Sequence, residues 1–245
     1  MSPPLGPVRQ AVILAAGFGS RLRPLTDSVP KAMAPVAGKP LLEHHVEWVR
    51  RHGVTEIFVN LHYLPGAIPE YFGDGRDRGV HIEYSVEPEI RGTAGGVRGF
   101  GAALDPEFFV IYGDVFSRLD YQGMAESFRR HPGAAGMGLI GTTDHPHDSD
   151  LAEVDEDLRF LKIHPKPHDS LPPRYHSMKG IFIFRREILA DIPAGGYYDI
   201  DHQLLPRLLE KGREVYGHVS GDYTRDIGTL ERRLEVEAYC RTLGI

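Results

Sequence analysis

Residues 11–40 read AVILAAGFGSRLRPLTDSVPKAMAPVAGKP, an apolar run that changes into a turn rich in glycine and basic residues. The run Ala11–Ala15 predicts a buried strand. Gly17 and Gly19 follow it, where a glycine-rich turn can bring backbone N–H groups close to a phosphate. The pattern is not the dinucleotide fingerprint, whose third glycine is replaced by Leu22, and it lacks the Gly-Lys-Ser/Thr of a P-loop. The stretch therefore predicts a phosphate-binding loop of another kind.

Two cations follow these glycines in a fixed order, Arg21 first and Lys31 after the prolines Pro24 and Pro30. The arginine offers a planar fork of donors that suits phosphate oxygens, and the lysine adds a second charge on a proline-stiffened loop. Either residue taken singly could be a solvated surface charge. The ordered set together indicates a clamp for a polyphosphate.

The rest of the chain alternates between strand-like and helix-like patterns, which predicts an α/β fold. Further strands are expected at Glu56–Asn60, His81–Val86 and Phe108–Tyr112. Helices are expected at Leu41–Arg51, Ile68–Phe72, Ala94–Leu104, Ile200–Lys211 and Leu230–Thr242. After about residue 115 the pattern favours hairpins, with loops at residues 143–150 and 166–174. We expect a Rossmann-like, three-layer mixed fold: a mainly parallel sheet with helices on both faces and a smaller antiparallel subregion, with ligands at the carboxyl ends of the strands.

Composition narrows the class of protein. The chain has 245 residues, 41% hydrophobic and 25% charged, and its net charge of −6 argues against nucleic acid or an anionic membrane as partner. Cys240 is the only cysteine, which excludes a disulfide framework and a cysteine zinc site. The N-terminal MSPPLGPVRQ is too polar and proline-rich for a signal peptide. We expect one cytoplasmic domain over residues 1–245; formation of a homo-oligomer stays open.

Six segments, in order, resemble the sugar-1-phosphate nucleotidylyltransferases, also called nucleotide-sugar pyrophosphorylases. The opening stretch is similar to the signature of that family. The other five are EPEIRGTAGGV (Glu87–Val97), VIYGDVF (Val110–Phe116), HPKP (His164–Pro167), KGIFIF (Lys179–Phe184) and GDYTRDIGTLERRLEVE (Gly221–Glu237). The chain ends soon after the last one, so we expect no left-handed β-helix domain of the kind that some relatives append. The resemblance implies transfer of a nucleotidyl group from a nucleoside triphosphate to a sugar 1-phosphate, with pyrophosphate leaving.

The resemblance also implies roles for individual residues. Arg21 would hold the leaving pyrophosphate, and Lys31 would lie near the reacting groups. Asp114 and Asp226 would bind Mg²⁺, a cation that prefers oxygen ligands, although each aspartate alone also suits a turn or a helix cap. Lys166 and Gly180 would bind the sugar phosphate, the latter within the antiparallel subregion. The expected nucleotide-binding residues are Leu14, Ala15, Ala16, Gly17, Gly19, Glu87, Gly92 and Thr93.

The sequence departs from the family pattern at the sugar. Pro165 replaces the usual glutamate before the lysine, and Met178 replaces a common asparagine. Contacts to sugar hydroxyls could come instead from His164, His168 or Tyr197. The pairs His145/His147 and His164/His168 have no evident third ligand, so we interpret them as loop histidines and not as a metal site.

Glu87 bears on the choice of base. An ionised glutamate only accepts hydrogen bonds, which matches the two adjacent donors of guanine better than the single donor of uracil or thymine. This favours GTP and a mannose- or heptose-type guanylyltransferase. Alternatively, Glu87 faces solvent or caps the helix expected at Ala94. Enzymes using UTP, dTTP or CTP, and an inactive nucleotide-binding regulatory relative, are the other hypotheses; the retained Arg21, Lys31, Asp114, Lys166 and Asp226 favour activity.

Overall fold

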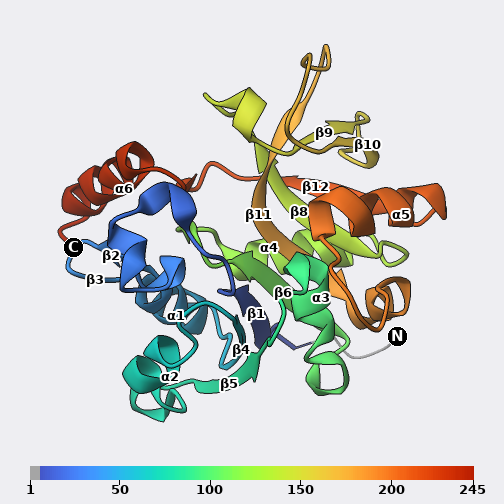
Figure 1. Ribbon diagram of the computed structural model, residues 1–245. Helices are drawn as coiled ribbons and strands as arrows, with labels where there is room; N and C mark the ends of the chain where they lie inside the picture. Colours follow the sequence, from blue (N-terminus) through green and yellow to red (C-terminus); the bar gives the residue numbers. More distant parts are fainter. Residues whose placement is uncertain (1–5) are drawn as a thin grey trace.

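The computed structural model describes residues 6–245, arranged around a nine-stranded mixed sheet (Figure 1). Its parallel part has the order β6 (Glu107–Tyr112), β1 (Gln10–Leu14), β4 (Glu56–Leu61) and β5 (His81–Val86). The first three strands are runs of apolar residues that are almost entirely buried, as expected for strands covered on both faces. Residues 1–5, on which part of the signal-peptide argument rests, lie outside the described residues.

The antiparallel part begins at β11 (His176–Arg185), which runs antiparallel to β6. It also pairs with β8 (Gly136–Gly141) and β9 (Leu151–Val154), and β9 forms a hairpin with β10 (Phe160–His164). β12 (Val215–Val219) completes the sheet beside β8, to which it runs parallel. Two short ribbons lie apart from it: β2 (Pro35–Val36) with β3 (Lys39–Pro40), and β7 (Val115–Ser117) with β13 (Thr224–Asp226).

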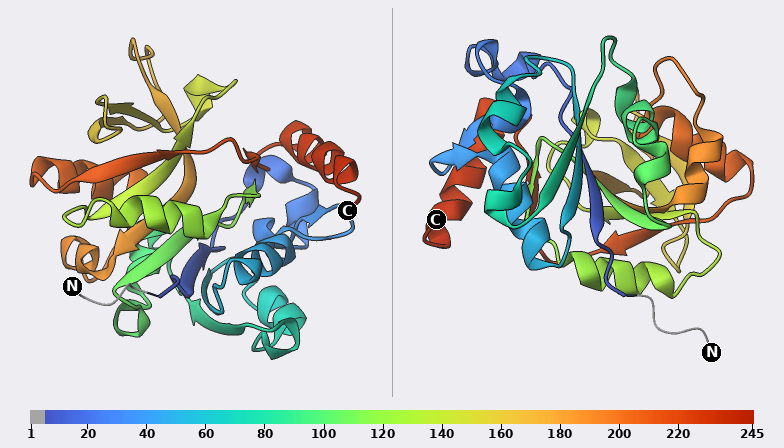
Figure 2. Two further views of the ribbon diagram at one scale, coloured as in Figure 1. Left: turned by 180° about the vertical axis from the view of Figure 1, so that it is seen from behind. Right: turned by 90° about the horizontal axis from the view of Figure 1, so that it is seen from below.

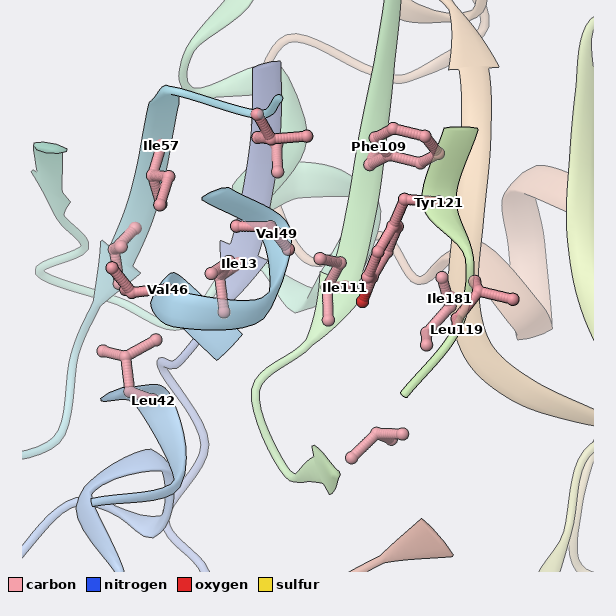
Figure 3. Close-up of a cluster of buried hydrophobic side chains, with 14 of the residues drawn as sticks. Ile13, Leu42, Val46, Val49, Ile57, Phe109, Ile111, Leu119, Tyr121 and Ile181 are labelled. Carbon is pink, nitrogen blue, oxygen red and sulfur yellow. The ribbon is translucent and has the colours of Figure 1, made fainter. Parts of the chain in front are cut away.

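Helices cover both faces of the sheet (Figure 2). On one face lie α1 (Leu41–Arg51), α2 (Ala67–Phe72) and α4 (Tyr121–Arg129), and on the other α3 (Gly92–Arg98) and α5 (Leu205–Glu210). In Figure 3, Leu42, Val46 and Val49 of α1 face the sheet residues Ile13 and Ile57. A third cluster packs α6 (Leu230–Thr242) against the opening loop and β7.

Short helical turns complete the loops. The 3-10 turns are Ser20–Leu22, Leu25–Asp27, Lys31–Met33, Arg76–Arg78, Gly101–Ala103, Pro146–Asp148 and Arg186–Asp191, and Ile200–Leu204 forms a π-helix. No helix within residues 6–245 combines the length and the apolar character needed to cross a bilayer.

The predicted α/β class is confirmed, and three details differ from expectation. The helix expected at Ala94–Leu104 spans Gly92–Arg98 instead, because its glycines favour an early end. The helix expected at Ile200–Lys211 begins as a π-helix and becomes α-helical only at Leu205. Helix α4 was not predicted, although Asp120 caps it by accepting a hydrogen bond from Gly123 N, and its buried residues recur at helical spacing.

Candidate active site

A cavity of about 360 Å³ opens where β1, β4 and β6 end. Parallel strands place their carboxyl ends at one edge of the sheet, so the loops that follow them meet there. This edge brings together most of the residues that the sequence singled out. The lining includes Leu14, Ala15, Ala16, Gly17, Gly19, Arg21, Lys31, Gly92, Thr93 and Asp114.

The opening loop is held in shape by buried contacts. Asn60, near the end of β4, accepts a hydrogen bond from Ala15 N at 2.8 Å and so fixes the chain just after β1. Gly19 has φ 64° and lies against Lys31, where an added Cβ would come within 2.9 Å of the Lys31 Cβ. Thr26 Oγ1 donates to Gly19 O at 2.8 Å. A glycine is required here because the turn needs both a positive φ and close approach to the lysine.

Glu87 lies beneath this loop and not on the wall of the cavity. It is 2% exposed, so the alternative that it faces solvent is wrong. Its Oε1 accepts from Asn60 Nδ2 at 2.9 Å, and its Oε2 accepts from Arg91 N at 2.9 Å. Glu87 is not one of the described residues that line the main cavity. Its carboxylate links Asn60 to the residue that precedes α3, which gives it an internal partner for each oxygen.

Thr93 lies at the first turn of α3, on the wall of the main cavity. Its hydroxyl and its backbone N–H both donate to Asp199 Oδ1, at 2.9 and 3.0 Å. The same hydroxyl accepts a hydrogen bond from Ile200 N at 2.7 Å. Thr93 therefore joins α3 to the start of the π-helix at the wall of the cavity.

A second cavity of about 110 Å³ adjoins the first, and Arg21, Tyr112 and Asp114 line both. The predicted residues Lys166, Gly180 and Asp226 lie on its wall. Gly180 has φ 67°, and an added Cβ would come within 2.9 Å of the Tyr112 ring. The junction places the glycine-rich loop on one side of Asp114 and Lys166 on the other.

Lys166 is held by Asp150, a residue that sequence reasoning missed. Asp150 Oδ2 lies 3.2 Å from Lys166 Nζ, and Oδ1 accepts from the Lys166 backbone N at 3.0 Å. Burial opposes the charge on Lys166, but the neighbouring Asp150 outweighs it and raises the pKa of the lysine. Lys166 therefore stays a fixed cation at the wall of the second cavity.

The two predicted metal ligands come together through the β7–β13 ribbon. Asp226 pairs with Val115, the residue after Asp114, and Ile227 N donates to Asp114 O at 2.8 Å. Lys31 Nζ lies 2.5 Å from Asp114 Oδ2. Burial opposes ionisation of Asp114, yet the charge of Lys31 outweighs it and lowers its pKa.

These carboxylates suit Mg²⁺, which takes one or two protein oxygens and completes its shell with water and phosphate. Residues 6–245 contain no group of three or more His, Cys, Asp or Glu side chains placed to hold a metal ion. Because each carboxylate already has a cationic partner, a metal would have to share or displace it.

A chain of ion pairs around Asp226 was also missed. Arg232 Nη1 lies 2.6 Å from Asp226 Oδ1, and Arg232 Nη2 lies 2.6 Å from Asp148 Oδ2. Asp148 in turn accepts from Arg21 Nη1 at 2.8 Å. The loop at residues 143–150 thus places an anion on the arginine expected to meet phosphate. Its composition predicted only a loop, and nothing in the local sequence indicated this contact.

The histidines and Tyr197 differ in whether they line a cavity. His164 pairs with Glu153 at 2.5 Å, and His168 Nε2 lies 2.7 Å from Ser149 O; neither lines the two cavities. Tyr197 lies on the wall of the first cavity and not the second. His145, expected to be an ordinary loop histidine, lines the second cavity and lies 3.7 Å from Asp226 Oδ2.

The sequence model of the family described as "Nucleotidyl transferase" matches residues 10–242. The chain belongs to this family. Among its relatives, mannose-1-phosphate guanylyltransferase of Mycobacterium tuberculosis is 33% identical over 90% of the chain and 61% of its own length. UTP–glucose-1-phosphate uridylyltransferase of Synechocystis is 34% identical over 84% of the chain and 57% of its own length. The chain thus spans about three fifths of these nucleotidyltransferases.

The fold is also that of solved structures in this group. A putative glucose-1-phosphate thymidylyltransferase from Bacillus anthracis, crystallised with sucrose, superposes with a TM-score of 0.85 at 22% identity. The match covers 96% of each chain. At this identity the likeness establishes the shared arrangement of strands and helices. The nucleotidyl transferase fold is therefore supported by both sequence and structure.

Proposed function

We propose that this nucleotidyl transferase moves a nucleotidyl group from a nucleoside triphosphate to a sugar 1-phosphate, releasing pyrophosphate. The observation that carries the proposal is the junction of the two cavities at Arg21, Tyr112 and Asp114. One cavity has a glycine-rich loop with two cations, and the other has a fixed lysine. A triphosphate in the first and a sugar phosphate in the second would meet at Asp114.

In this proposal a phosphate oxygen of the sugar 1-phosphate attacks the α-phosphorus, and the bond to the leaving pyrophosphate breaks. The backbone of Gly17 and Gly19 approaches the triphosphate, Arg21 neutralises the pyrophosphate and Lys31 lies near the reacting groups. Lys166 binds the phosphate of the sugar next to Gly180. Catalysis then comes from positioning and from neutralising charge that develops in the transition state.

Asp114 and Asp226 would hold Mg²⁺ in this site. When bound, the ion supplies charge neutralisation to the triphosphate. The protein's own part is to hold the two aspartates side by side and next to cations, which the β7–β13 ribbon, Lys31 and Arg232 do.

For the substrates, we propose GTP and a mannose- or heptose-type sugar, supported by the similarity to the guanylyltransferase of Mycobacterium tuberculosis. The equally similar uridylyltransferase of Synechocystis favours UTP with a glucose-type sugar as the second candidate. Glu87 no longer supports guanine directly, because its carboxylate oxygens have internal partners.

The test is release of pyrophosphate by the purified chain with Mg²⁺. GTP, UTP, dTTP and CTP are each paired with mannose, glucose and heptose 1-phosphates. We expect GTP with mannose or heptose 1-phosphate to give the highest kcat/KM. A higher kcat/KM with UTP and glucose 1-phosphate would select the second candidate. Nucleotide binding without turnover for any pair would indicate a regulatory protein instead.

A further inference from the structure

Asp201 is a buried carboxyl group in the wall of the second cavity, on the π-helix Ile200–Leu204. It is 6% exposed. Its Oδ2 accepts a hydrogen bond from the Tyr112 hydroxyl, whereas its Oδ1 is buried and has no hydrogen-bond partner among residues 6–245. A buried acceptor without a donor is unfavourable, because it has lost its hydrogen bonds to water and forms none within the protein.

Asp150, the neighbouring carboxylate, has the polar partners that Asp201 Oδ1 lacks. Asp150 lines the same cavity, and its oxygens meet Lys166 and also His202 Nε2 at 3.1 Å. Within residues 6–245, Asp201 makes no ion pair of this kind. Burial, together with the charge of Asp150, raises the pKa of Asp201 to about 7. A hydrogen-bond donor placed against Asp201 would relieve this unfavourable environment.

We propose that Asp201 accepts a hydrogen bond from a sugar hydroxyl and so helps to select the sugar, an inference that rests on the proposed function. The cavity that contains Lys166 and Gly180 also contains Asp201, and it is the place where a sugar joined to a bound phosphate would lie. Asp201 thereby supplies a polar contact on the wall that Met178 also lines. The group on the sugar that faces Asp201 is a hydroxyl, since an acyl oxygen or a carboxylate could not donate.

The experiment compares wild type with Asp201→Asn, using the best substrate pair from the pyrophosphate assay. The variant has the same shape, and its amide can still accept from Tyr112 while presenting NH₂ in place of Oδ1. At pH 8, above the pKa of Asp201, we expect the KM for the sugar 1-phosphate to rise by roughly tenfold to a hundredfold, the usual effect of a hydrogen bond to a charged group. The KM for the nucleotide should change less than twofold.

Monodeoxy analogues of the same sugar 1-phosphate give the decisive readout. For one deoxy analogue, wild type should lose about as much kcat/KM as Asp201→Asn loses with the parent sugar. For that analogue, the kcat/KM of wild type and of the variant should then be equal. Asp201→Ser repeats the test with a smaller side chain. Asp191→Asn is the matched control, since Asp191 is equally buried but pairs with Lys211 and Arg213 outside both cavities.

An unchanged sugar KM in both Asp201 variants, or equal losses for every deoxy analogue in wild type and variant, would overturn the inference. A rise in sugar KM in Asp191→Asn of similar size would assign the effect to general loosening and overturn it too. Wild type that is inactive with every substrate pair would instead overturn the proposed function. The two failures are therefore distinguishable.

Discussion

Glu87→Gln is the substitution that separates an internal role of Glu87 from the reading of a base. Each carboxylate oxygen accepts one N–H, from Asn60 Nδ2 and from Arg91 N, both at 2.9 Å. Glutamine can accept with one oxygen only, and its NH₂ would face the second donor. At 2% exposure no solvent is available to replace the lost bond. Loss of one hydrogen bond to a charged group is worth about 1.5–3 kcal/mol, so we expect the free energy of unfolding to fall by about 2 kcal/mol.

Activity should fall without a change in specificity. Asn60 also holds Ala15 N, so loosening Asn60 disturbs the opening loop for every nucleotide alike. We expect kcat/KM for GTP and UTP to fall by the same factor. Urea unfolding measures the stability change, with an unchanged m-value showing that the comparison is sound. Glu89→Gln makes the same chemical change at an exposed position two residues away. This control should change neither the free energy of unfolding nor kcat/KM.

The opposite pattern would refute this reasoning. If Glu87→Gln keeps wild-type stability and selectively loses GTP, the carboxylate reaches the base, and the hydrogen bonds to Asn60 and Arg91 give way on binding. A loss of stability with an unchanged GTP-to-UTP ratio supports the internal role.

Three further predictions concern the site and helix α1. Asp114→Asn and Asp226→Asn should each stay folded and lose turnover with Mg²⁺ by a factor equivalent to about 3–4 kcal/mol of transition-state stabilisation; wild-type rates in both would exclude them as ligands. Arg21→Ala should raise the KM for the triphosphate and Lys166→Ala the KM for the sugar 1-phosphate, and steady-state kinetics with each substrate varied would reveal the reverse assignment. His44 and His45 are buried residues of α1. Burial, together with the neighbouring His44, lowers the pKa of His45 to about 4, so as pH falls below about 6.5 the unfolded chain binds a proton before the folded chain does. Stability should therefore decline between pH 6.5 and 4 by up to about 3 kcal/mol, and His45→Gln should reduce that decline in urea unfolding; equal slopes would contradict the assignment.

Sequence alone determined the features that depend on neighbouring residues. The strand at β5 and the helices α1 and α6 have the predicted bounds, because apolar spacing and β-branched runs are local properties. The glycine-rich loop after β1 was evident for the same reason. Helix α4 was missed in spite of a local signal, while α3 was predicted too long because its glycines were given too little weight.

Tertiary structure alone decided how distant residues meet. Asp226 lies beside Asp114 only because β13 pairs with β7. Asp148 binds both Arg21 and Arg232 only because the loop at residues 143–150 meets the opening loop and α6. Glu87 carries the same carboxyl group whether it faces a base or Asn60, and its contact with Asn60 follows from the pairing of β4 with β5. The sequence specifies the functional group of each side chain. Its burial and its distant partners depend on long-range packing, which no local pattern encodes.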